Sequence, residues 1–155
     1  MPSNCFLPFF LFIIFVNSIH FTNAQCSGTI TLISSFGSFD DGSGASSYTN
    51  SLNCAWLIQP SGAIFVELNI TSFSTESNYD FVTIYDGSDA SAPILSGPFS
   101  GSLSNIPVIY STTGSVYVRF TTDSGGTAAG WNINYAGRSG SPPTCSGMVI
   151  INVSE

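Results

Sequence analysis

Three acidic residues lie beside β-prone runs, in positions from which their side chains could meet. Asp80 directly precedes the run 81–85, Glu76 lies in the loop before it, and Asp123 directly follows the run 116–122. If these runs pair as antiparallel strands, the start of one and the end of the other share one end of a sheet. Hard oxygen ligands from separate loops are what Ca²⁺ prefers, so these three residues are a candidate calcium site. The alternative is three loop carboxylates that are solvated independently, as surface acids usually are.

Backbone oxygens could complete such a site. Ser124, Gly125 and Gly126 follow Asp123, and because the two glycines lack side chains only their carbonyls could serve as ligands. We name the Gly125 carbonyl as the candidate and expect weak affinity, on the order of 10⁻⁴–10⁻³ M as in other extracellular modules. Zinc is not expected, because no imidazole is nearby and the thiols are remote or engaged.

The ionisable composition excludes most enzyme chemistry. The 155 residues include nine Asp/Glu, two Arg, no Lys and one His, for a formal net charge of −7. That histidine, His20, lies in a segment that we expect to be removed, so His- and Lys-dependent catalysis and His-ligated zinc are excluded. Phosphate binding needs clustered Lys and Arg, so nucleic acid is not an expected partner. The adjacent Asp40 and Asp41 would point apart rather than face each other across a substrate. We therefore expect no catalytic residues.

The N-terminal segment has the pattern of a secretory signal peptide. Residues 6–16 form an uncharged apolar run, too short to span a bilayer, and the small-x-small sequence Thr22-Asn23-Ala24 follows. We expect residues 1–24 to be removed, giving a secreted chain from Gln25 with no membrane insertion. The alternative is that this segment anchors the protein in a membrane or packs into its core.

The cysteines fit an oxidising compartment. Cys5 would leave with the signal peptide, and Cys26 and Cys54 are then the expected disulfide pair. Cys145 is left over. It is free, pairs between chains, or has its partner beyond Glu155.

The dominant periodicity is that of β-strands. In the run 64–70, Ile64 and every second residue after it face one way, and Glu67 and Asn69 face the other. Similar runs occur at 29–33, 55–58, 81–85, 116–122 and 131–135. Turn signals separate them at Asp41-Gly42, Pro60-Ser61-Gly62, Asp86-Gly87, Gly97-Pro98, Thr113-Gly114 and Gly125-Gly126. This spacing predicts an antiparallel β-sandwich over residues 25–136. Residues 137–155 are predicted to be a Gly/Ser/Pro linker followed by a tail or the start of a further module.

Two sequons make asparagines candidates for glycosylation. These are Asn69, on the outward face of its predicted strand, and Asn152 in the tail. The alternative is that both are ordinary exposed asparagines.

Several segments, taken in order, resemble a CUB domain. They are Cys54-Ala55-Trp56-Leu57-Ile58, Ile64-Phe65-Val66-Glu67-Leu68, Phe73-Ser74-Thr75-Glu76, Tyr79-Asp80-Phe81-Val82-Thr83-Ile84-Tyr85-Asp86-Gly87, Val116-Tyr117-Val118-Arg119-Phe120-Thr121-Thr122-Asp123 and Gly130-Trp131. The match runs from Cys26 to Tyr135. The resemblance implies an all-β, jelly-roll-like sandwich that serves extracellular proteins as an interaction module.

The resemblance also implies roles for individual residues. Many CUB domains bind Ca²⁺ through residues that correspond to Glu76, Asp80 and Asp123. A family tyrosine that braces this site corresponds either to Phe39, which would replace it, or to Tyr48. Cys26–Cys54 matches the family's first disulfide. The second is absent, because Ser77/Asn78 and Ser100-Gly101 occupy its places.

The functional expectation is Ca²⁺-dependent binding of an extracellular protein through its exposed Lys or Arg side chains. The alternative is a carbohydrate-binding module that uses aromatic residues, for which the candidates are Tyr48, Tyr110, Tyr117 and Trp131. Two further readings stay open. One is a targeting arm of a longer extracellular enzyme, and the other is a structural role with Cys145 crosslinking chains.

Overall fold

The computed structural model describes residue 26 and residues 28–140. Within that part of the chain there are nine strands and no helix long and apolar enough to cross a membrane. The strands are β1 (Thr29–Leu32), β2 (Phe36–Asp40), β3 (Asn53–Ile58), β4 (Phe65–Ser74), β5 (Phe81–Tyr85), β6 (Ile94–Phe99), β7 (Ile109–Tyr110), β8 (Val116–Thr121) and β9 (Gly130–Arg138).

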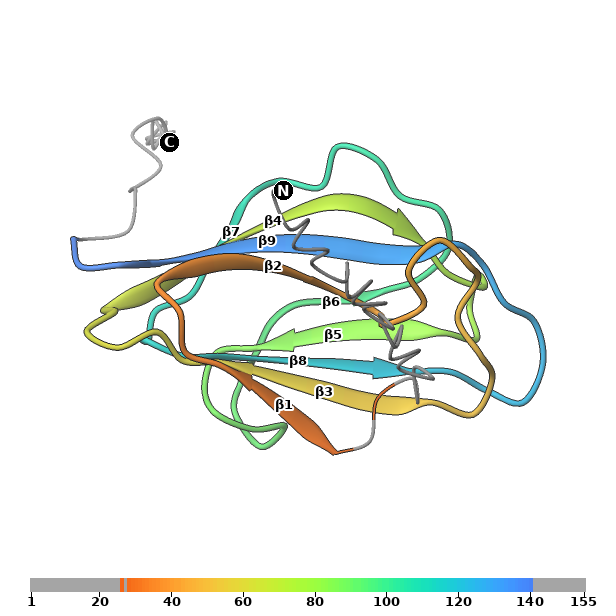
Figure 1. The fold of residues 1–155 in the computed structure, drawn as a ribbon, viewed down its shortest axis with the longest axis horizontal. Coiled ribbons are helices and arrows are strands. Elements are labelled where there is room, and N and C mark those ends of the chain that lie inside the picture. The colour runs from red at the N-terminus through yellow and green to blue at the C-terminus, as the bar shows by residue number, and fades with distance from the viewer. Residues whose placement is uncertain (1–25, 27, 141–155) are drawn as a thin grey trace, which may run out of the picture.

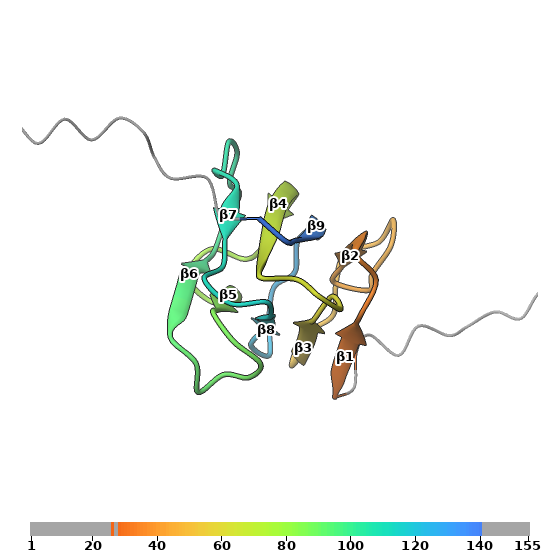
Figure 2. The same cartoon turned by 90° about the vertical axis from the view of Figure 1, so that its left-hand side faces the viewer.

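The strands form the predicted β-sandwich. One sheet, here sheet A, has the order β1-β3-β8-β5-β6, and the other, sheet B, has the order β2-β9-β4-β7. Figure 1 shows the two layers side on, and Figure 2 shows them along the strands. Every named strand pair is antiparallel except β1 with β3, which is parallel, so the prediction of an antiparallel sandwich holds apart from this edge.

The core lies between the sheets and is rich in aromatic side chains. Trp56 of sheet A meets Trp131 of sheet B edge to face, with ring centroids 4.9 Å apart. Phe39 contacts both indoles, at 5.8 Å from Trp56 and 5.6 Å from Trp131. Such pairs contribute about 0.5–1.5 kcal/mol beyond the apolar area that they bury. This cluster therefore joins the sheets and makes the sandwich a rigid base for its loops.

The sequence missed three strands, and all three lie at sheet edges. β2, β6 and β7 are outer strands of their sheets, so each has a neighbouring strand on one side only. Edge strands carry a weaker apolar alternation, so the sequence pattern was too faint to detect them. The predicted turn at Gly97-Pro98 is wrong for the same reason, because both residues lie within β6, in an irregular part of its pairing with β5.

Two further strand predictions need correction. Ile64 is not an inward residue of its strand: it precedes β4 and is 57% exposed, whereas Val66 is completely buried. β9 continues to Arg138, so Gly137 and Arg138 pair in a strand rather than beginning the linker.

The predicted disulfide joins Cys26 to Cys54, whose Cα atoms are 5.4 Å apart. It ties the start of the domain to Cys54, a buried residue near the beginning of β3. Asn69 is exposed on β4, on the outer side of sheet B as the sequence predicts. The proposed signal segment 1–24, Cys145, Asn152 and the tail lie outside the described residues.

Candidate metal centre

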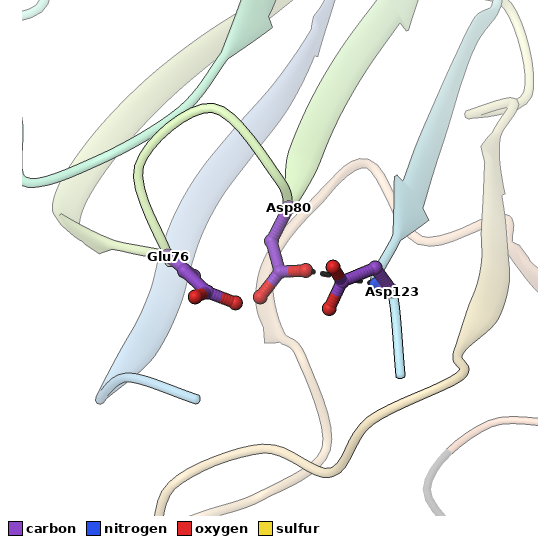
Figure 3. Close-up of side chains that lie close together, drawn as sticks. All are labelled: Glu76, Asp80 and Asp123. Atoms are coloured by element: carbon purple, nitrogen blue, oxygen red, sulfur yellow. Dashed lines mark hydrogen bonds between the residues drawn. The ribbon is translucent and has the colours of Figure 1, made fainter. Parts of the chain in front are cut away.

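The pairing of β5 with β8 brings two of the predicted acids to the same end of sheet A. Phe81, the first residue of β5, lies opposite Thr121, the last residue of β8, so Asp80 and Asp123 lie just beyond this pair. Glu76 reaches them from the loop between β4 and β5, as Figure 3 shows. Each of the three offers a carboxylate oxygen, and these oxygens all lie within 4.8 Å of one another. The three residues predicted from strand ends therefore form one cluster in space.

Asp80 is the fixed centre of the cluster. It is completely buried, and its two oxygens accept hydrogen bonds from the Tyr48 hydroxyl at 2.5 Å and from the backbone N–H of Asp123 at 3.0 Å. Its own N–H donates to the Glu76 carbonyl at 3.1 Å. Because these bonds reach three segments of the chain, Asp80 sets the positions of the other two acids.

Tyr48 is the residue that braces the site. It comes from the loop between β2 and β3, is buried, and packs edge on against Phe120 with ring centroids 5.1 Å apart. Its hydroxyl donates to Asp80 and accepts from the Glu76 N–H at 2.8 Å. Burial, reinforced by the hydrogen bond to Asp80, raises the pKa of Tyr48 and keeps the phenol protonated as a donor. The bracing tyrosine is thus not replaced by Phe39, which packs in the aromatic core.

The turn after β8 closes over the cluster. Asp123 is held at its carbonyl by the N–H of Ser51 at 2.5 Å and at its carboxylate by the N–H of Gly125 at 2.8 Å. Gly126 has a left-handed φ of 79° and lies so close to the Glu76 carboxylate that a Cβ would overlap it. Only glycine allows this backbone approach. Gly125 contacts the cluster through its N–H, which donates to the Asp123 carboxylate. Ligation of a metal ion by the Gly125 carbonyl stays a prediction.

Glu76 lies in an environment that disfavours its charged form. Its Oε2 is shielded from solvent and has no hydrogen-bond partner. Partial burial raises the pKa of Glu76, and the negative charges of Asp123 and then Asp80 raise it further. A shielded, unpartnered carboxylate oxygen beside two further carboxylates is the environment that a bound cation would relieve.

Neither arginine supplies that cation. Arg138 is paired with Glu67, with Nη2 and Nε 2.9 and 3.0 Å from the same carboxylate oxygen. Arg119 donates from Nε to the Asn53 side chain at 3.0 Å. Since residues 26 and 28–140 contain no other Arg, Lys or His, the described chain holds no cation to neutralise the cluster. The donor set therefore fits a hard divalent cation from outside.

A hydrogen-bond link stands where the family's second disulfide would lie. Ser100 Oγ accepts from the N–H of Asn78 at 2.7 Å and donates to the carbonyl of Glu76 at 3.0 Å. Next to it, the Gly101 N–H donates to Thr75 Oγ1 at 3.0 Å. These bonds tether the loop that carries Glu76, a role for Ser100 that residue type alone did not suggest.

Two other acids have structural roles that differ from their predicted ones. Asp41, predicted to be a loop residue, is buried, and it accepts from the N–H of Trp131 and the N–H of Ser43, both at 2.8 Å. Asp86 does not act within a local turn. It accepts from the N–H and hydroxyl of Thr112 and so holds the loop between β7 and β8. The bond from Ser43 is a local loop contact. The sequence could not show the bonds from Trp131 and Thr112, because these two partners are remote along the chain.

The aromatic candidates for sugar binding separate by burial. Tyr48 and Trp131 are 1% and 2% exposed and belong to the core. Tyr110 and Tyr117 are half-buried and keep part of their rings at the surface. Only the latter two could contact a ligand.

This chain is similar in sequence to proteins that contain CUB domains. The family model of the CUB domain matches residues 26–135. Human cubilin is 34% identical over 106 residues, which cover 66% of this chain and 3% of cubilin. Human Tolloid-like protein 2 is 35% identical over 96 residues, 59% of this chain and 9% of that protein. The chain thus spans a small fraction of the length of these relatives.

Solved structures share the fold. The MASP-1 CUB2 domain bound to Ca²⁺ has a TM-score of 0.61 at 25% identity, covering 72% of this chain and 99% of that one. The extracellular region of zebrafish Gpr126/Adgrg6 has a TM-score of 0.61 at 27% identity, covering 72% and 15%.

Proposed function

This chain belongs to the CUB domain family, and from that premise we propose that it is a secreted, non-catalytic module that binds Ca²⁺ at the acidic cluster. With Ca²⁺ bound, the cluster would bind a basic side chain of a protein partner. The observation that carries the proposal is the shielded and unpartnered Oε2 of Glu76 beside the carboxylates of Asp80 and Asp123. Similarity to a CUB domain solved with Ca²⁺ supports it.

Glu76, Asp80 and Asp123 would hold the ion. Ca²⁺ supplies positive charge at the place where three carboxylates now repel one another, and its preference for oxygen ligands from flexible loops suits their origins. Asp80 is already oriented by two hydrogen bonds, so the buried ligand needs little reordering. The exposed Asp123 and half-buried Glu76 lie toward solvent, where further ligands can approach.

A partner's ammonium or guanidinium group fits the oxygens that remain. Charge-assisted hydrogen bonds to carboxylates are about twice as strong as neutral ones. The net charge of −7 would also steer a basic partner toward this module, and salt would weaken that steering.

Calorimetric titration with Ca²⁺ tests the ion site. We expect measurable uptake by the wild-type chain and none by Asp80→Ala or Asp123→Ala. Asp86→Ala is the matched control, because Asp86 lies at the opposite end of β5 and should leave uptake unchanged. Unchanged uptake by Asp123→Ala, an exposed change that leaves the core intact, would refute the site.

Retention on an immobilised Lys-rich peptide tests the partner chemistry. Retention should require Ca²⁺, be reversed by EDTA and fall with rising salt. An acetylated-lysine version of the peptide is the control, since acetylation removes the charge and keeps the chain length. Equal retention of both peptides would show that basic side chains are not the ligand.

Secretion and modification at Asn69 belong to the same proposal. Asn69 is exposed on β4, so a glycan there would leave the core undisturbed. Protein secreted from eukaryotic cells should lose mass on amidase deglycosylation, and the loss at this site should disappear in Asn69→Gln. A wild-type chain without any glycan mass at Asn69 would contradict this part.

A further inference from the structure

A hollow of about 290 Å³ opens on the outer face of sheet A, away from the aromatic core. Its lining includes Thr29, Asn53, Ala55, Tyr117 and Arg119 from β1, β3 and β8, with Ala90 from the loop between β5 and β6. The volume lies near the lower end of the range for small-molecule sites and suits about one sugar ring. Three neighbouring strands form most of the lining, so the hollow is largely preformed.

Arg119 gives this hollow a positive charge, and none of the described residues that line the hollow is acidic. It is the only charged residue in the five strands of sheet A, and its lateral neighbours in the register are Ala55 and Thr83. Asn53 holds its Nε at 3.0 Å, which fixes one edge of the guanidinium plane. The terminal nitrogens make no hydrogen bond to the described residues, whereas those of Arg138 engage Glu67.

The other lining groups suit a sugar. Tyr117 is half-buried, and its ring packs at a tilt of 58° against Tyr85 of the neighbouring strand, with ring centroids 6.1 Å apart. A tyrosine ring offers an apolar face to the C–H groups of a sugar and a hydroxyl to its oxygens. Thr29 and Asn53 add a hydroxyl and an amide.

We propose that this hollow binds a carboxylated sugar unit of an extracellular glycan, such as a uronate. The terminal nitrogens of Arg119 take the sugar carboxylate as a two-pronged ligand, and Tyr117 packs against the ring. An acidic peptide side chain would use only the guanidinium and leave most of the hollow unfilled. This site is separate from the acidic cluster and needs no Ca²⁺.

NMR titration of the ¹⁵N-labelled chain in EDTA tests the assignment with three probes: methyl β-glucuronide, methyl β-glucoside and acetate. We expect saturable shifts at the Arg119 Nε–H and the Tyr117 N–H with the glucuronide. Binding should be at least about tenfold weaker with the glucoside, which lacks the carboxylate, and with acetate, which lacks the ring. EDTA keeps the result independent of the calcium site.

Variants locate the binding. Arg119→Gln should weaken glucuronide binding at least about tenfold, and Arg119→Lys should weaken it less, because lysine keeps the charge and loses the planar fork. Arg138→Gln is the control and should bind normally. Acetate that binds as tightly as the glucuronide, a Glu-containing peptide that binds as tightly, or normal binding by Arg119→Gln would each overturn the proposal.

Discussion

The acidic cluster and the outer hollow of sheet A are opposites in charge. Among the described residues, the cluster brings together three carboxylates with no basic side chain paired to them, and the hollow is lined by one guanidinium and no carboxylate. They also differ in construction, because the cluster joins segments remote in sequence through a buried tyrosine, while Arg119 lies on one strand with a single hydrogen bond. Neither region pairs with an opposite charge from the described residues, so both are suited to ligands from outside.

The two regions should also differ in their importance for stability. Asp80 and Tyr48 are buried, so the cluster is continuous with the core. Arg119 and Tyr117 lie half-buried on a sheet face. Changes at the cluster should therefore affect folding and binding together, whereas changes at the hollow should affect binding alone.

Tyr48→Phe should have the largest effect on stability. It removes the donor to Asp80 and the acceptor for the Glu76 N–H, which leaves buried polar groups unsatisfied. We expect a loss of about 2–3 kcal/mol in the free energy of unfolding, measured by urea denaturation in EDTA. Tyr117→Phe is the matched control and should change it by less than about 0.5 kcal/mol. Equal losses from the two variants would remove the contrast between the regions.

Gly126→Ala should come next. The left-handed φ disfavours alanine, and the new methyl group would displace the Glu76 carboxylate. We expect a loss of about 1–2 kcal/mol and a strong loss of Ca²⁺ uptake by calorimetry. Gly125→Ala is the neighbouring control, because a Cβ there meets no atom within 4 Å. Similar Ca²⁺ uptake by both variants would mean that Glu76 need not occupy its present position.

The two arginines provide a smaller comparison. Arg138→Gln breaks a surface ion pair with Glu67 and should lower the free energy of unfolding by about 0.2–1 kcal/mol. Arg119→Gln breaks no ion pair and should change it less. Chemical denaturation at low and high salt separates them, because only the Arg138 contribution should shrink as salt rises. A salt-dependent loss in Arg119→Gln would reveal a carboxylate partner in solution.

The pH dependence of the Ca²⁺-free protein should show the smallest effect. The pKa of Glu76 is raised in the folded state above its ordinary value of 4.5, first by burial and then by Asp123 and Asp80. Between the unfolded and folded pKa values the fold therefore binds more protons, so stability falls as the pH rises through that window. The melting temperature of Glu76→Gln should accordingly rise relative to that of the wild type as the pH increases from 4.5. A difference that does not change with pH would show that neither burial nor the neighbouring carboxylates raise the pKa of Glu76 in the folded state.

The central strands of the fold were predictable, and so was the edge strand β1, but the other three edge strands were not. Central strands such as β5 and β8 are buried on one face, so their alternation of apolar residues is written in the sequence. Edge strands such as β2 bury less and showed no such signal. The site followed the same rule, because Asp80 and Asp123 adjoin two of the best-defined strands, and their meeting follows once those strands pair.

The sequence by itself determined the charge deficit, the sandwich and the three acids, because composition and strand periodicity are local properties. Only the tertiary structure decided that Tyr48 rather than Phe39 braces the cluster, that Glu76 has a shielded and unpartnered oxygen, and that Arg119 faces a hollow without a carboxylate. Each of these depends on which residues of distant segments become neighbours. That is settled by how the two sheets pack and how their loops hydrogen-bond, and neither is a property of any single stretch of chain.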